Sequence, residues 1–189
     1  MANTKFDICN MALTSVGANT ITSFEDGSTE AIIAGQNYDL VVEHLLCVHR
    51  WRFATKQGAP NRLLETPSDK YQYYFQLPSD CLQVQAVRVA SRVIEFDRFD
   101  DRIACDATEI VLDYTFRPDE NKFPAHFTNL VVQWLRSIFN GSIRRDQKLA
   151  DEQRTFIERI TLPRAKSIDS QQQSARRMPP ARLVAVRGY

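Results

Sequence analysis

Glycine is scarce in this sequence, and the few glycines lie too far apart to form a phosphate-binding loop. There are six in 189 residues, at positions 17, 27, 35, 58, 141 and 188. The G-x-G-x-x-G and Walker A patterns, whose glycines let the backbone approach a phosphate, are both absent. The G-x-S-x-G pattern of a nucleophilic serine is absent as well. The sequence therefore gives no recognisable catalytic constellation, and we expect no enzymatic activity.

Long apolar runs and an excess of one charge are also missing. No run reaches 18 apolar residues, so no membrane partner is expected. The opening residues, MANTKFDICN, have neither the basic nor the apolar region of a secretory signal. The formal net charge is only +1, which excludes a polycation that holds DNA through bulk charge. With 43% hydrophobic residues, the composition is that of a globular protein.

Cysteine occurs without the spacing of a metal site or a redox motif. The four cysteines are Cys9, Cys47, Cys81 and Cys105. Without a secretory signal they are expected to be reduced and mostly buried. His44 and Cys47 would share one face of a helix, but His49 would point elsewhere, and no second closely spaced pair completes a zinc site. We expect neither a metal nor any other cofactor.

Helical periodicity is present at both ends of the sequence. Thr4 followed by Asp7 predicts the start of a first helix, which Gly17 ends. A second helix is predicted to start around Asp26–Ser28 and to reach about His49.

The second half of the sequence predicts two more helices. Pro124 is suited to a first helical position, and the apolar residues that follow keep helical spacing until Asn140-Gly141. A fourth helix starts between Ser142 and Asp146, and Pro163 should kink or break it. Its apolar residues Leu149, Phe156 and Ile160 fall on one side.

Between these two halves the apolar pattern has a period of two. Residues 71–77, 82–90, 93–98 and 109–117 are rich in β-branched and aromatic residues, which is typical of strands. In the last segment two sets alternate: Ile110, Leu112, Tyr114 and Phe116 on one face, and Val111, Asp113, Thr115 and Arg117 on the other. This alternation predicts an antiparallel sheet with one dry and one wet face.

The predicted fold class is therefore α+β. Residues 1–58 and 122–170 are expected to form a four-helix bundle. Residues 59–121 are expected to form an antiparallel β-sheet region inserted between the second and third helices. Residues 171–189 are expected to be an extended C-terminal tail.

The charges are distributed unevenly along the chain. Residues 1–49 contain one lysine and six acidic residues, a net charge of −5, so the rest of the chain carries +6. The segment 171–189 contains Arg176, Arg177, Arg182 and Arg187 and no acid. This tail has three interpretations: a solvated end, a nucleic-acid contact, or a segment that docks on protein. We favour docking on protein, because apolar side chains such as Leu183 and Val186 need burial.

Several segments, in order and spacing, resemble the head-to-tail adaptor family of tailed phages, whose members in short-tailed phages are called tail tubular protein A. They are ICNMALTSVGANTITSFEDGSTEA near the start, HRWRFATK at the end of the second helix, YQYYFQLPSDCLQV in the strand region, and YTFRPDENKFPAHFTNLVVQWL before and within the third helix. Together they extend from residue 8 to about residue 140. Beyond residue 140 the similarity is one of architecture only, and Pro163 departs from it.

The resemblance implies a structural protein of the virion, assembled in the host cytoplasm. Family members form a ring, usually of twelve copies, between the portal protein above and a tail nozzle or other tail protein below. Double-stranded DNA passes through the channel without being read. The motif positions Trp51, Phe53, Leu77, Pro78, Asp80 and Leu82 carry over as structural residues. The residues expected to contact the portal or a neighbouring subunit are Arg176, Arg177, Arg182, Leu183 and Val186.

Two other interpretations of the sequence remain. The chain could be a small DNA-binding module that uses its basic second half, in which case its affinity for DNA should fall steeply as salt rises. It could also be a small enzyme with an unrecognised site, which would require a deep pocket with converging titratable groups.

Overall fold

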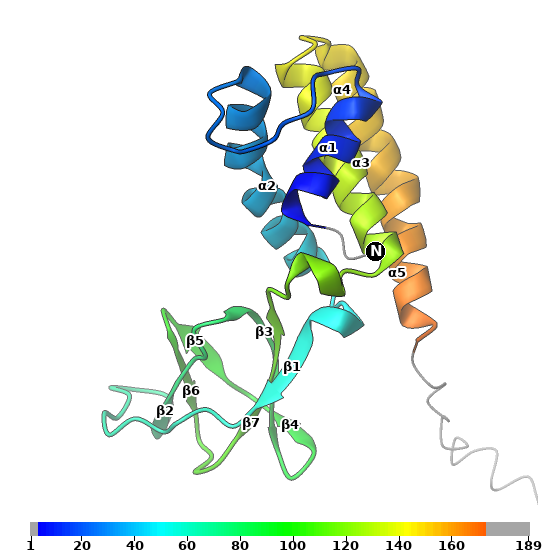
Figure 1. The fold of residues 1–189 in the computed structure, drawn as a ribbon. Helices are drawn as coiled ribbons and strands as arrows, with labels where there is room; N and C mark the ends of the chain where they lie inside the picture. Colours follow the sequence, from blue (N-terminus) through cyan, green and yellow to red (C-terminus); the bar gives the residue numbers. More distant parts are fainter. Residues whose placement is uncertain (1–3, 173–189) are drawn as a thin grey trace, which may run out of the picture.

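The computed structural model describes residues 4–172, and it places every strand of this range between the second and third helices. The helices are α1 (Lys5–Ser15), α2 (Thr29–Val48), α3 (Ala125–Ser142), α4 (Gln147–Phe156) and α5 (Leu162–Ser170). The strands are β1 (Thr55–Gly58), β2 (Tyr73–Gln76), β3 (Cys81–Val89), β4 (Arg92–Ile94), β5 (Asp97–Phe99), β6 (Arg102–Cys105) and β7 (Val111–Phe116). Short 3-10 turns, η1 (Arg52–Ala54) and η2 (Glu120–Lys122), precede β1 and α3. The predicted α+β class is confirmed. In Figure 1 the helical part, α1 to α5, lies above the β part, β1 to β7.

The first two helices begin where their capping residues predict. The Thr4 hydroxyl oxygen accepts a hydrogen bond from the Asp7 backbone N–H at 3.2 Å, and the Asp7 carboxylate accepts one from the Thr4 backbone N–H at 2.9 Å. This reciprocal pair is a capping box. Ser28 caps α2 by accepting from the Ala31 backbone N–H at 3.2 Å. Both predicted starts are therefore confirmed.

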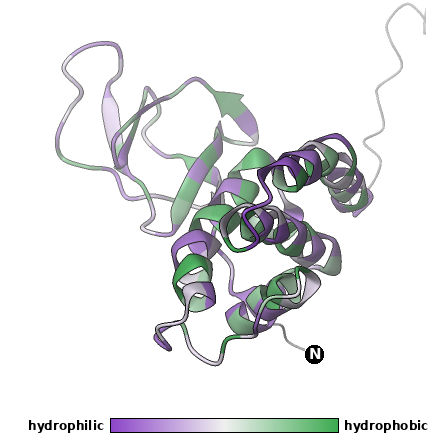
Figure 2. Cartoon of the chain, turned by 90° about the horizontal axis from the view of Figure 1, so that it is seen from above, coloured by the Kyte–Doolittle hydropathy of each residue, from purple (hydrophilic) through white to green (hydrophobic). Residues whose placement is uncertain are grey.

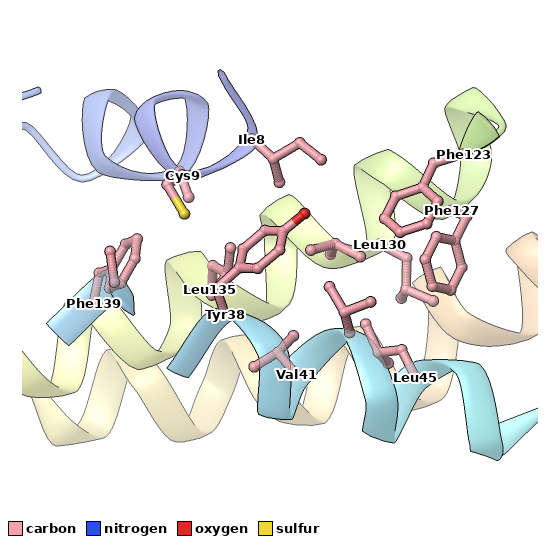
Figure 3. Close-up of a cluster of buried hydrophobic side chains, with 14 of the residues drawn as sticks. Ile8, Cys9, Tyr38, Val41, Leu45, Phe123, Phe127, Leu130, Leu135 and Phe139 are labelled. Carbon is pink, nitrogen blue, oxygen red and sulfur yellow. The ribbon is translucent and has the colours of Figure 1, made fainter. Parts of the chain in front are cut away.

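The core of the helical part forms around α3, which packs against α1, α2, α4 and α5. Figure 3 shows Ile8 and Cys9 of α1, Tyr38 and Leu45 of α2, and Leu130 of α3 converging between the helices. All five are fully buried. Hydrophobic and hydrophilic residues alternate along each helix in Figure 2, as amphipathic helices require.

Pro163 does not end the fourth helix. The chain passes from α4 through a π-helical turn, η3 (Ile157–Thr161), directly into α5 and stays helical to Ser170. At the end of this turn the Leu162 backbone N–H donates to the Ile157 carbonyl, five residues earlier. The widened turn accommodates the proline ring, which would otherwise clash with the preceding turn and which has no N–H to donate. Of the kink or break expected at Pro163, the break is therefore wrong.

The strands form two antiparallel sheets where one was expected. One sheet has the order β1-β7-β3-β4, and the other has the order β2-β6-β5. The predicted strand at 93–98 divides into β4 and β5, which belong to different sheets. Strands β1 and β6 were not predicted, because both are only four residues long and each pairs with a strand far away in the sequence, β1 with β7 and β6 with β2. The other partner of β6 is the neighbouring three-residue strand β5.

The face assignment for 109–117 is only half right. Ile110, Leu112 and Tyr114 are buried in a second hydrophobic core, as predicted. On the face predicted to be wet, Val111 is exposed, but Asp113 and Thr115 have no exposed surface. The side chains that cover this face come from outside β7 and define the first feature of the site.

Candidate functional site

A buried carboxylate lies where the helical part meets the β part. Asp113 of β7 accepts hydrogen bonds from Gln57 Nε2 at 2.7 Å, Arg88 Nε at 2.8 Å and Arg50 Nη2 at 3.0 Å. Arg50 follows the end of α2, Gln57 lies on β1 and Arg88 lies on β3. The carboxylate thus joins three separate segments of the chain.

The hydrogen bonds to Asp113 determine its charge state. Desolvation is the largest single influence and would raise the pKa of the carboxyl, but the bonds from Gln57, Arg88 and Arg50 together lower the pKa below its ordinary value of 3.8. Two arginine donors and one amide therefore keep a buried carboxylate ionised. The arrangement orients the end of α2 on the sheet through charge-assisted bonds.

A second buried carboxylate, Asp169 in α5, contacts the same junction. The Arg52 backbone N–H lies 3.2 Å from each of its oxygens. His49 Nε2 lies 3.5 Å from one oxygen, and His126 Nε2 lies 3.9 Å from the other. Desolvation lowers the pKa of His49, although Asp169 acts in the opposite direction. Asp169 therefore connects the last turns of α5 to the segment that leaves α2.

Two of the motif residues quoted for the family resemblance lie at the centre of this junction. The Trp51 side chain is fully buried, and its indole Nε1–H donates to the Leu45 carbonyl at 2.7 Å. Its ring meets the Phe127 ring edge-on, with centroids 5.1 Å apart. Phe53 packs against Phe127 and Phe123 at 4.9 and 5.9 Å. These rings fill the space between the end of α2 and the start of α3.

The other motif residues follow β2 and lead into β3. Leu77 is buried in the second hydrophobic core, and Pro78 comes directly after it. Asp80 accepts hydrogen bonds from Lys56 Nζ at 2.6 Å and from the Tyr114 hydroxyl at 3.2 Å. The bond from Lys56 is the main cause of the lowered pKa of Asp80. Leu82 is half-buried and packs against the core of the helical part.

The predicted contact residues of the C-terminal tail, Arg176, Arg177, Arg182, Leu183 and Val186, lie outside the described residues.

Exposed apolar side chains mark surfaces that sequence analysis did not identify. In the helical part, Ile32 and Leu40 of α2 are 48% and 67% exposed, and Phe156 of α4 and Ile160 of η3 are 54% and 52% exposed. Exposed apolar side chains also occur in the β part, at Leu64, Val93, Phe99 and Val111. Phe156 and Ile160 belong to the predicted apolar side of the fourth helix, but they do not face the core. Contiguous exposed apolar surface is characteristic of interaction sites.

A groove runs between α3 and the helix formed by α4, η3 and α5. His126, Asn129 and Gln133 of α3 line one wall. Phe156, Ile160, Arg164 and Ile168 line the other. A mixed apolar and polar lining of this kind suits contact with a protein surface.

Within residues 4–172 no group of three histidine, cysteine or acidic residues is placed to bind a metal ion. His44 packs against the Trp134 ring at 5.2 Å, whereas His49 faces Asp169. Cys9 and Cys105 are buried and Cys81 is half-buried, but Cys47 is exposed. No helix in the same range is both long enough and apolar enough to cross a bilayer.

Neither a protein-family model nor a curated protein sequence matches the chain.

Proposed function

We propose that this protein is a structural head-to-tail adaptor of a tailed-phage virion. It forms a ring, of twelve copies by the family resemblance, that joins the portal protein above to a tail nozzle or other tail protein below. Double-stranded DNA passes through its channel without being read. The proposed location is the neck of the virion, after assembly in the host cytoplasm.

The observation that carries the proposal is the separation of the exposed apolar surfaces. Ile32 and Leu40 lie on α2, Phe156 and Ile160 lie on the helix beyond α3, and Val93 lies on β4. Figure 1 shows α2 and α5 on different sides of α3, and β4 at the end of the molecule away from the helices. An adaptor in a ring needs two different lateral surfaces for its neighbours and a further surface for the next component along the axis.

The proposed architecture is a four-helix bundle with an inserted β region. The bundle would form the wall of the ring, and the β part would point toward the tail component. The contacts of Asp113 and Asp169 support this arrangement, because they hold the β part and α5 in fixed orientations relative to α2. The C-terminal tail, with Arg176, Arg177, Arg182, Leu183 and Val186, would bind the portal or a neighbouring subunit.

Electron microscopy of the full chain with purified portal rings from the same source tests the proposal. We expect end-on views of a ring that caps the portal. Deletion of residues 172–189 should leave the circular dichroism spectrum of the helices unchanged and abolish capping. A truncated chain that still caps portals would overturn the role of the tail, and the absence of any ring on portals would overturn the adaptor.

A salt titration with duplex DNA separates the adaptor from a DNA-binding module. An adaptor should bind duplex DNA weakly and with little dependence on salt. Micromolar affinity that falls steeply as salt rises would favour the DNA-binding module.

A further inference from the structure

The two flanks of the helical part carry opposite charges. Helix α2 contains Glu30, Asp39 and Glu43 and no lysine or arginine. The segment 154–170, from the end of α4 through α5, contains four basic residues, Arg154, Arg159, Arg164 and Lys166, and two acids, Glu158 and the buried Asp169. The net charges are thus −3 on α2 and +2 on 154–170.

Part of this charge is not neutralised inside the chain. Asp39 forms ion pairs with Lys5 and Arg117 at 2.8 and 2.9 Å. By contrast, Glu43, Arg159 and Arg164 are exposed and form no ion pair with any other residue in the range 4–172. These three groups are available to a partner.

Each charged flank also carries exposed apolar side chains at helical spacing. Ile32 and Leu40 are eight residues apart on α2, which places them on one side of the helix two turns apart. Phe156, Ile160 and Ile168 line the outer wall of the groove between α3 and α5, and Arg164 lies among them. We call the first set, with Glu43, the α2 face. We call the second set, with Arg159 and Arg164, the α5 face.

We propose that the α2 face of one copy binds the α5 face of the next copy. This inference rests on the proposed ring and names its lateral contact. Opposite charges favour this pairing, whereas two α2 faces or two α5 faces would bring like charges together. Leu40 lines one groove of the helical part, with Trp134 and Arg154, whereas Phe156 and Ile160 line a different one. A bound copy therefore still offers its second face to a further copy, as a heterologous interface requires.

The apolar residues supply the buried centre of the contact, and the charges surround it. Leu40 enters the groove lined by Phe156 and Ile160, while Glu43 meets Arg159 or Arg164. The charged pairs remain accessible to solvent, so they set orientation and rate of association more than affinity.

Cysteine cross-linking with a short bismaleimide tests the pairing in the full-length chain. Cys47 is first replaced by serine, because it is the exposed cysteine among the described residues. In this background we make Leu40→Cys, Ile160→Cys and the control Val93→Cys, whose side chain is as exposed but lies on the β part. All three positions are exposed, so the circular dichroism spectrum should not change.

We expect a cross-linked dimer when L40C and I160C are mixed. When L40C is mixed with V93C, we expect about tenfold less cross-linked dimer, because only the paired faces hold two thiols at high effective concentration. Neither L40C nor I160C should cross-link to itself. A chain with both substitutions should give a ladder of oligomers. Raising the salt concentration should reduce the yield.

Two outcomes would overturn the pairing: no L40C–I160C product above the control, or a dominant dimer of one variant with itself. Failure of the pairing is distinguishable from failure of the adaptor proposal. Rings on portals without the cross-link would mean that other faces form the ring. The cross-link without portal capping would keep the pairing and remove the adaptor.

Discussion

Replacing Asp113 with asparagine removes a fully buried negative charge and leaves two arginines facing a neutral amide. Loss of one partner of a buried ion pair destabilises a protein by about 3–5 kcal/mol. The side chains of Arg88 and Arg50 are 33% and 39% exposed, so water can solvate them again after the substitution. We therefore expect Asp113→Asn to lower the free energy of unfolding by about 2–3 kcal/mol, or the melting temperature by about 5–10 °C.

Thermal unfolding followed by circular dichroism measures this effect, with Asp119→Asn as the matched control. Asp119 pairs with Lys122 on the surface, where the side chain of Asp119 is 74% exposed, and this substitution should change stability by less than about 0.5 kcal/mol.

The same experiment on Asp113→Asn has a pH dependence. Because folding lowers the pKa of Asp113 below 3.8, its contribution is complete above that pH and is lost as the pH falls toward the folded value. The difference between wild type and variant should therefore shrink below about pH 4. If Asp113→Asn is no more destabilising than Asp119→Asn at neutral pH, the account of this carboxylate is wrong.

Two further predictions concern the helical part. Trp51→Phe should lower the free energy of unfolding by about 2–4 kcal/mol in urea titrations, because it leaves the Leu45 carbonyl without its donor and opens a gap in the core. Trp134→Phe, at a half-buried ring, is the control, and an equal loss in both variants would contradict the role of the Trp51 hydrogen bond. In the native protein a thiol reagent should modify Cys47 first, and Cys9 should react only on unfolding, because burial raises its pKa to about 12. The rapid first modification should be lost in Cys47→Ser, which would confirm that Cys47 is the thiol that reacts first. Rapid modification of Cys9 in the folded chain would refute this prediction.

The helices were predictable because their signals are local. A capping residue, its partner three positions later and a repeating apolar stripe all lie within one helix, so Thr4 and Ser28 were recognised without knowledge of the rest of the chain. The α+β class followed because apolar residues recur at helical spacing at both ends of the chain and with a period of two in the middle. Both inferences need only neighbouring residues.

The burial of Asp113 was not predictable from β7 itself. The alternation in 109–117 is the ordinary pattern of a half-exposed strand, and the residues that cover Asp113 come from positions 50, 57 and 88. Arg50 directly follows the predicted second helix and Arg88 lies within the predicted strand 82–90, but neither position by itself indicates a buried partner. Only the pairing of β7 with β1 and β3 brings them to one carboxylate.

The exposed side of the fourth helix was missed for a related reason. The predicted apolar side of this helix was formed by the large residues Leu149, Phe156 and Ile160. The small residue Ala150 faces the core instead. A Cβ atom at Gly141 would lie 3.5 Å from that of Ala150, which is van der Waals contact, so α3 and α4 leave no spare space between these two positions. Close packing of two backbones selects small residues, and hydropathy alone does not reveal it.

The pairing of β1 with β7 has a consequence for how this molecule can change over time. Thr55 lies opposite Thr115 and Gly58 opposite Leu112, so the chain enters and leaves the β part at neighbouring points. Loops at the far end of the β part can lengthen, shorten or be exchanged without altering the distance between the end of α2 and the start of α3. A change in the outer loops of the β part therefore need not disturb the packing of the helices.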